Sequence, residues 1–304
     1  MNRIDWTGVF PAVTTKFKED LTLDRDWIAR NLEAQLAAGA KGIVVSGSLG
    51  EASTLSMTEK AELVRMAVDI VDGRAPVVCG VGQRSTADAC RMAEWVARNG
   101  GDGIMLLPPM LYPSDRRETT TFLRSVAAAT DLPIMLYNNP VAYTVDVTPA
   151  MLAELAEEPK FEAVKESSDD VRRLTDIINL VGDRYRLFTG VDNIALEALM
   201  LGAVGWIAGL VCAFPRETVV LYELARQGRY KEAVELYRWF MPLLHLDVNV
   251  KLVQNIKLAE AMVGLGTETV RPPRLTLAGE ERDRVEATIR AALDTRPDVE
   301  SLLA

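Results

Sequence analysis

The chain has 304 residues, of which 49% are hydrophobic and 25% are charged, the composition of a soluble globular protein that can bury a large core. Its formal net charge of -9 argues against nucleic acid and anionic membrane surfaces as partners, because both would repel it. The cysteines at 79, 90 and 212 are odd in number, widely spaced and free of any CxxC pattern. This spacing argues against a disulfide framework and a structural zinc site.

The sequence also predicts a cytoplasmic protein. Its first residues, 1 to 6, lack the charged-then-apolar layout of a secretion signal, and no eighteen apolar residues run together. We therefore expect neither export nor a membrane span. Reduced thiols fit a cytoplasmic location.

Eight short segments have the composition of β-strands, and stretches with helical spacing separate them. Ile28, Leu32 and Leu36, for example, recur at helical spacing before the second segment, so the order is strand, helix, strand, helix. The predicted strands cover residues 8–15, 42–48, 76–82, 103–108, 133–138, 161–165, 186–191 and 205–210.

The pattern favours a (β/α)8 TIM barrel. Segments such as 42–45 and 103–107 are continuously apolar rather than alternating, as expected for parallel strands covered on both faces. A doubly wound open sheet is the competing architecture. However, no GxGxxG follows the first strand and no GxxxxGK[ST] occurs, which favours the barrel.

Four helical patterns follow the eighth strand, at residues 216–227, 230–244, 249–263 and 279–294. Only about one helix is needed to complete a barrel. We therefore predict a barrel over residues 1–228 and a C-terminal helical extension over 229–304, with Gly228 and the segment 271–274, Arg-Pro-Pro-Arg, as helix breaks.

Polar residues end several predicted strands, and in such barrels the chemistry lies at the carboxyl ends of the strands. Lys165 ends the sixth strand and Tyr137 lies at the end of the fifth, so an amine and a phenol are expected side by side. A half-buried amine loses its proton more easily and can attack a carbonyl to form a Schiff base. A lysine that only snorkels at a strand end is the alternative for Lys165 alone.

Four motifs stand in order at the strand ends: Gly47-Ser48-Leu49-Gly50-Glu51, Tyr137-Asn138-Asn139-Pro140, Val164-Lys165-Glu166-Ser167 and Gly190-Val191-Asp192. In this order they resemble the dihydrodipicolinate synthase and N-acetylneuraminate lyase superfamily over nearly the whole chain. The resemblance implies a barrel, usually a homotetramer, with a lysine that forms a Schiff base with a 2-oxo acid and with no metal or organic cofactor.

The resemblance also implies roles for individual residues. Lys165 would form the Schiff base and Tyr137 would transfer protons. Ser48 and the backbone amide of Leu49 would hold the substrate carboxylate. The substrate-binding residues expected in this way are Gly47, Ser48, Leu49, Asn139, Ser167, Gly190 and Ile207.

Three positions depart from the synthase pattern. The synthase has a second threonine where this chain has Leu49, and an arginine that pairs with a substrate carboxylate where this chain has Ala142. The tyrosine that a neighbouring subunit contributes after the fourth strand aligns best with Met110, and Tyr112 is offset. These departures argue against lysine biosynthesis.

Within the superfamily, the chain most resembles the 1-pyrroline-4-hydroxy-2-carboxylate deaminases of hydroxyproline breakdown. The similar runs are residues 137–143, 165–170 and 239–245. The resemblance implies a deaminating hydrolase that yields 2,5-dioxopentanoate and ammonia. The alternatives are a pyruvate-dependent aldolase, lyase or 2-oxo acid dehydratase, including 4-hydroxy-tetrahydrodipicolinate synthase, and a barrel that binds ligands without catalysis.

His245 is the only histidine, and it lies in an apolar helical stretch of the extension. We expect it to be a packed structural residue. Without a second histidine, a metal site is not expected either.

Overall fold

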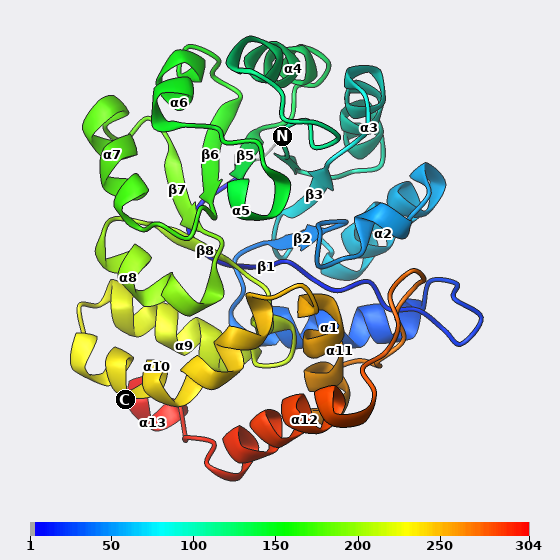
Figure 1. Cartoon of the computed structure of the whole chain (residues 1–304), viewed down its shortest axis with the longest axis vertical. Coiled ribbons are helices and arrows are strands. Elements are labelled where there is room, and N and C mark those ends of the chain that lie inside the picture. The colour runs from blue at the N-terminus through cyan, green and yellow to red at the C-terminus, as the bar shows by residue number, and fades with distance from the viewer. Residues whose placement is uncertain (1–3, 304) are drawn as a thin grey trace.

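The computed structural model describes residues 4–303. Its centre is an eight-stranded parallel sheet with the order β1-β8-β7-β6-β5-β4-β3-β2 (Figure 1). A single bridge between Ala12 and Val44 joins the two outer strands. The predicted (β/α)8 barrel is therefore confirmed. The first three residues, which belong to the segment used to argue against a secretion signal, lie outside the described part.

All eight predicted strands are present, and seven of them lie within the predicted range. Their bounds are β1 Gly8–Pro11, β2 Ile43–Val45, β3 Val77–Val81, β4 Gly103–Leu106, β5 Ile134–Asn138, β6 Phe161–Glu166, β7 Arg186–Thr189 and β8 Gly205–Ala208. Only β6 runs one residue further than predicted. Most of the others end earlier, because the residues after them turn away into the loops at the mouth of the barrel.

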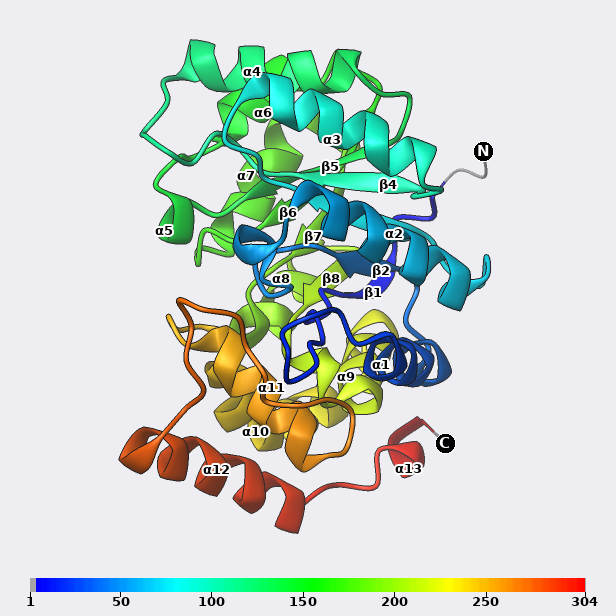
Figure 2. The same ribbon diagram turned by 90° about the vertical axis from the view of Figure 1, so that its right-hand side faces the viewer.

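Helices cover the outside of the strands (Figures 1 and 2). The outer helices are α1 Arg25–Ala38, α2 Met57–Val71, α3 Thr86–Arg98, α4 Arg116–Ala128, α6 Pro149–Leu155, α7 Arg172–Val181, α8 Ala195–Met200 and α9 Pro215–Arg226. The short helix α5 Pro140–Tyr143 lies at the mouth of the barrel instead (Figure 1). Local sequence explains several starts. Ser56 and Asp115 form capping boxes with the glutamate three residues later, which satisfies free amides of the first turn.

The extension contains α10 Tyr230–Leu244, α11 Leu252–Met262, α12 Gly279–Asp294 and α13 Glu300–Leu303. The first three match predicted helices, and the segment around Pro272 and Pro273 is not helical. In Figure 2, α10 and α11 lie against the barrel and α12 lies outside them. The division into a barrel and a separate extension at residue 228 remains a prediction.

The core has two layers. One fills the space between strands and helices, and the other fills the barrel itself. Inside the barrel, Trp6, Phe10 and Phe188 pack ring against ring, and Ile207 and Tyr137 belong to the same layer. The interior is therefore packed, and chemistry is left to its two ends.

None of the helices within residues 4–303 combines the length and the apolar character needed to cross a bilayer.

Candidate active site

Lys165 and Tyr137 lie next to each other at the carboxyl ends of β6 and β5. The two residues are paired in register across these strands, and the amine nitrogen of Lys165 lies 4.0 Å from the centre of the Tyr137 ring. Both side chains are almost fully buried, at 7% and 5% exposed. The lysine is thus more deeply buried than the half-buried position expected from sequence.

Burial is the largest influence on the pKa of both groups. It lowers the pKa of Lys165, although the negative charges of Tyr143, Asp247 and Asp192 would partly raise it again. It raises the pKa of the Tyr137 phenol, which keeps that group protonated. Burial thus favours a neutral amine beside a neutral phenol, which is the pair that imine formation with proton transfer requires.

Gly190 leaves the space that the lysine occupies. A side chain at this position, directly after β7, would collide with the Cε atom of Lys165 and the hydroxyl of Ser167. The Ser167 hydroxyl is buried and has no hydrogen-bond partner among residues 4–303. Contact of this hydroxyl with a substrate remains a prediction.

The turn after β2 carries the predicted carboxylate site. Ser46 and Glu51, at its two ends, both have a left-handed backbone, with φ of 56° and 54°. Glu51 is fully buried. It accepts hydrogen bonds from Lys257 at 2.5 Å and from the backbone amide of Arg271 at 3.0 Å. The extension thus fixes the shape of the turn that contains Gly47, Ser48 and Leu49.

Lys257 is a second buried lysine, and burial lowers its pKa to about 8. Its amine, however, bonds to Glu51 and to the backbone carbonyl of Thr269 at 2.6 Å. An amine held in an ion pair is a poor nucleophile, which leaves Lys165 as the better candidate.

Tyr143 is a site residue that the sequence reasoning missed. It ends the four-residue helix α5, and its hydroxyl is hydrogen-bonded to the Ser48 hydroxyl. Its ring packs edge to face against Tyr137, with 6.0 Å between the ring centres. Ser48, Tyr143 and Tyr137 therefore form a line of hydroxyl groups from the carboxylate turn to the lysine. The signal that could have located it is the Asn139-Pro140 pair, which starts a helix.

Asn139 acts mainly within the protein. Its side chain accepts a hydrogen bond from the amide of Ala142 at 2.9 Å and donates one to the Tyr137 hydroxyl at 3.1 Å. It caps α5 and holds the phenol in place. Ile207 is 1% exposed and lies in the packed barrel interior. Direct contact of either residue with a substrate remains a prediction.

The prediction that His245 is packed is wrong. The residue lies at the end of α10, its side chain is exposed, and its Nδ1 atom lies 3.1 Å from the Asn193 amide nitrogen. Apolar neighbours in the sequence do not show whether a side chain at the end of a helix points into the core or into solvent. Tyr112, after β4, is also exposed, whereas Met110 packs against the barrel interior.

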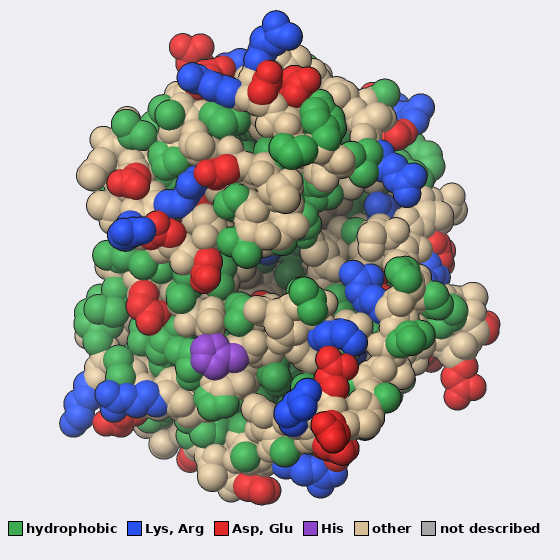
Figure 3. Space-filling model, viewed as in Figure 1, with side chains coloured by type: hydrophobic (Ala, Val, Ile, Leu, Met, Phe, Trp, Pro, Cys, Tyr) green, Lys and Arg blue, Asp and Glu red, His purple; other side chains and the backbone are tan. Residues whose placement is uncertain are grey.

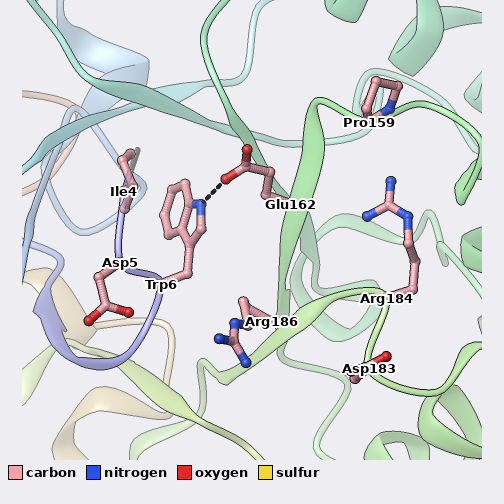
Figure 4. A pocket seen from close by; sticks show the side chains of 8 residues that line it. All are labelled: Ile4, Asp5, Trp6, Pro159, Glu162, Asp183, Arg184 and Arg186. Carbon is pink, nitrogen blue, oxygen red and sulfur yellow. Dashed lines mark hydrogen bonds between the residues drawn. The ribbon is translucent and has the colours of Figure 1, made fainter. Parts of the chain in front are cut away.

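Figure 3 shows the barrel mouth as a hollow near the centre of the face. A different pocket, with a volume of about 540 Å³, lies at the opposite ends of β6 and β7 (Figure 4). There Trp6 donates to Glu162 at 2.8 Å, and Arg184 is bonded to three backbone carbonyls. Since these groups are already paired and far from Lys165 along the strand, we assign this pocket no catalytic role.

Comparison with known proteins agrees with this architecture. The pattern of the dihydrodipicolinate synthetase family matches residues 5–292. The 4-hydroxy-tetrahydrodipicolinate synthase of Methanothrix thermoacetophila is 32% identical over 96% of this chain and 97% of its own length. That of Methanospirillum hungatei is 32% identical over 88% of this chain and 92% of its own.

Solved structures are similar as well. The 4-hydroxy-tetrahydrodipicolinate synthase of Methylacidiphilum fumariolicum superimposes with a TM-score of 0.93 at 30% identity, covering 97% of this chain and 99% of that one. A dihydrodipicolinate synthase of Bacillus anthracis gives 0.91 at 28% identity, with 95% and 99% covered.

Proposed function

Because the chain belongs to the dihydrodipicolinate synthetase family, we propose that it is an enzyme in which Lys165 forms a Schiff base with C2 of a small 2-oxo acid or cyclic imine. Enzymes of this family use a covalent lysine Schiff base with pyruvate and need no metal or organic cofactor. The observation that carries the proposal is the buried Lys165 amine over the Tyr137 ring.

For the reaction itself, we propose the deamination of 1-pyrroline-4-hydroxy-2-carboxylate. Two positions in the motifs after β2 and β5 support a substrate with one carboxylate. Leu49 and Ala142 stand where the sequence comparison with the synthase expects a hydroxyl and an arginine. Burying a second carboxylate without such partners costs several kcal/mol.

The proposed chemistry begins with attack of neutral Lys165 on C2 of the ring imine. This exchanges one C=N bond for another and releases the ring nitrogen as an amine on C5. Loss of a C3 proton gives an enamine, which expels the C4 hydroxyl as water and forms a C3=C4 double bond. Proton shifts move the unsaturation to C4 and C5 and then to an imine at C5. Water hydrolyses that imine to an aldehyde and ammonia, and a second water releases Lys165 at C2.

Tyr137 is suited to relay protons to and from the reacting carbons, because it lies beside the lysine. Its raised pKa favours the protonated phenol, so it would first give its proton away and then take up the C3 proton. Tyr143 and Ser48 extend this hydroxyl line toward the carboxylate turn. We propose that they connect Tyr137 to bulk water within one chain, in place of the tyrosine that a neighbouring subunit contributes in the synthase pattern.

The second candidate is 4-hydroxy-tetrahydrodipicolinate synthase, in which the pyruvate enamine condenses with aspartate semialdehyde. The names of the relatives favour it, and none of those described above is named a deaminase.

One paired assay separates the candidates. The purified enzyme is incubated either with the hydroxypyrroline, with ammonia measured, or with pyruvate and aspartate semialdehyde, with loss of the aldehyde measured. We expect ammonia and little condensation. The variant Ala142→Arg should release less ammonia from the hydroxypyrroline, and it should not release ammonia from other cyclic imines. Rapid condensation with no ammonia from the pyrroline would replace the deaminase with the synthase.

A homotetramer in the cytoplasm remains part of the proposal. Leu111 and Val141, in the loops after β4 and β5, are 69% and 71% exposed, which is compatible with burial between subunits. Sedimentation velocity would test the subunit number.

A further inference from the structure

A carboxyl group from the helical extension lies at the barrel mouth. Asp247 ends the short 3-10 turn His245–Asp247 that follows α10. A side chain at Gly209, directly after β8, would collide with the Asp247 carboxyl. The extension therefore places this carboxyl against the backbone at the end of a barrel strand, at the same end of the barrel as Lys165.

A second carboxyl lies beside it but is fully occupied. Asp192, two residues after Gly190, accepts hydrogen bonds from the Trp206 ring at 2.9 Å and from the backbone amides of Leu210 at 2.8 Å and Gly209 at 3.2 Å. These donors hold Asp192 in place inside the protein. No hydrogen bond to the Asp247 carboxyl occurs from any other residue of 4–303, so its oxygens remain available to a bound molecule.

The surroundings of Asp247 favour a protonated carboxyl. Burial raises its pKa well above the ordinary value, the neighbouring Asp192 raises it further, and Lys165 lowers it. The charge of Asp247 also acts on Tyr137 and raises the pKa of its phenol. His245, on the same turn as Asp247, is exposed. This carboxyl group lies at the same end of the barrel as Lys165, and its raised pKa favours the protonated form that can donate a proton.

We propose that Asp247 is a catalytic residue, the acid that protonates the C4 hydroxyl of the ring-opened substrate as it leaves. This inference rests on the proposed deaminase function. The enamine nitrogen returns its electron pair to C2, the C3=C4 double bond forms, and the C4–O bond breaks. The oxygen takes the proton of Asp247 and leaves as water. The resulting carboxylate then accepts the proton lost from C5, which restores the acid.

The test is Asp247→Asn, which keeps the shape and removes the acidic proton. The matched control is Asp283→Asn, an exposed aspartate on α12 of the same extension. Ammonia release from the hydroxypyrroline should fall by about 10² or more in Asp247→Asn, as for other acid–base groups, and stay unchanged in the control. Borohydride trapping of pyruvate should remain within a few-fold of the unaltered enzyme in both, since that reaction has no leaving hydroxyl.

A second readout follows the intermediate itself. Borohydride added during turnover of the hydroxypyrroline should trap, in Asp247→Asn, an adduct that retains its hydroxyl and is heavier by one water than the dehydrated adduct. Ammonia release and adduct mass equal to those of the unaltered enzyme would overturn the role of Asp247 alone. A loss of pyruvate trapping equal to the loss of ammonia would also overturn it, because the residue would then be structural. Absence of ammonia from the unaltered enzyme would overturn the deaminase function and this inference together.

Discussion

The amine of Lys165 lies 4.0 Å above the ring of Tyr137, on the neighbouring strand and in register with it. The ring face attracts an ammonium ion, whereas burial favours the neutral amine. Burial is the largest influence on the pKa of Lys165 and lowers it, so it favours the uncharged form of the free amine. The protonated imine formed later carries a positive charge, and the ring face therefore stabilises that imine more than it stabilises the free lysine.

The variant Tyr137→Phe should therefore report on proton transfer. It keeps the ring under Lys165 and removes only the hydroxyl, so we expect turnover to fall by about 10² or more with the fold intact. Steady-state ammonia release and circular dichroism check this. The control Tyr230→Phe, at an exposed tyrosine of α10, should be unaffected. Activity of Tyr137→Phe within a few-fold of normal would leave the residue with a packing role.

Tyr143→Phe tests whether the hydroxyl line begins at the carboxylate turn. It removes the bond to Ser48 while keeping the edge-to-face contact with Tyr137. We expect a drop in turnover smaller than that of Tyr137→Phe, together with a raised KM, because Ser48 loses its partner beside the substrate carboxylate. If neither kcat nor KM changed, Tyr143 would lie outside the reaction path.

The buried pair of Glu51 and Lys257 should matter for stability. Breaking such a pair leaves an uncompensated buried charge, so Lys257→Met should lower the free energy of unfolding by about 3–5 kcal/mol in urea. The double variant with Glu51→Gln should recover part of this loss. Lys18→Met, at an exposed lysine, is the control. Equal stability of Lys257→Met and the control would show that the turn after β2 does not depend on this pair.

The lowered pKa of Lys165 predicts two pH effects of the same sign. Since only the neutral amine attacks, imine formation should rise with pH and level off below 10.5, the ordinary lysine value. The unfolded chain holds this proton more tightly than the folded one, so stability should rise with pH between the lowered value and 10.5. Lys165→Met should remove this rise. The rate of borohydride trapping and the free energy of unfolding in urea, each measured across pH, test the two effects. The same pH dependence of stability in Lys165→Met and in the unaltered enzyme would contradict the lowered pKa of Lys165.

The barrel could be predicted because its strands are continuously apolar and its helices recur at regular spacing. The positions at which the strands end were predicted less accurately. Val13 and Ser46, for example, are buried after their strands have ended, and a hydrophobic pattern reports burial rather than strand pairing. Strand order alone predicted that Lys165 and Tyr137 adjoin, because sequential strands of a barrel are neighbours.

Tyr143 and Asp247 could not be predicted in the same way. Tyr143 reaches the site because a four-residue helix turns the chain back over the mouth. Asp247 reaches it because the extension folds against β8, a contact between segments nearly forty residues apart that no local pattern encodes. An acidic residue directly after the run Leu243-Leu244-His245-Leu246 was the only signal available.

The most direct test of the account is to identify the lysine that forms the covalent intermediate. The enzyme is reduced with borohydride in the presence of pyruvate, digested, and its peptides are mapped by mass spectrometry. We expect the adduct on Lys165 and none in Lys165→Arg, whose guanidinium stays protonated and cannot attack. An adduct on Lys257, or no adduct at all, would contradict the account.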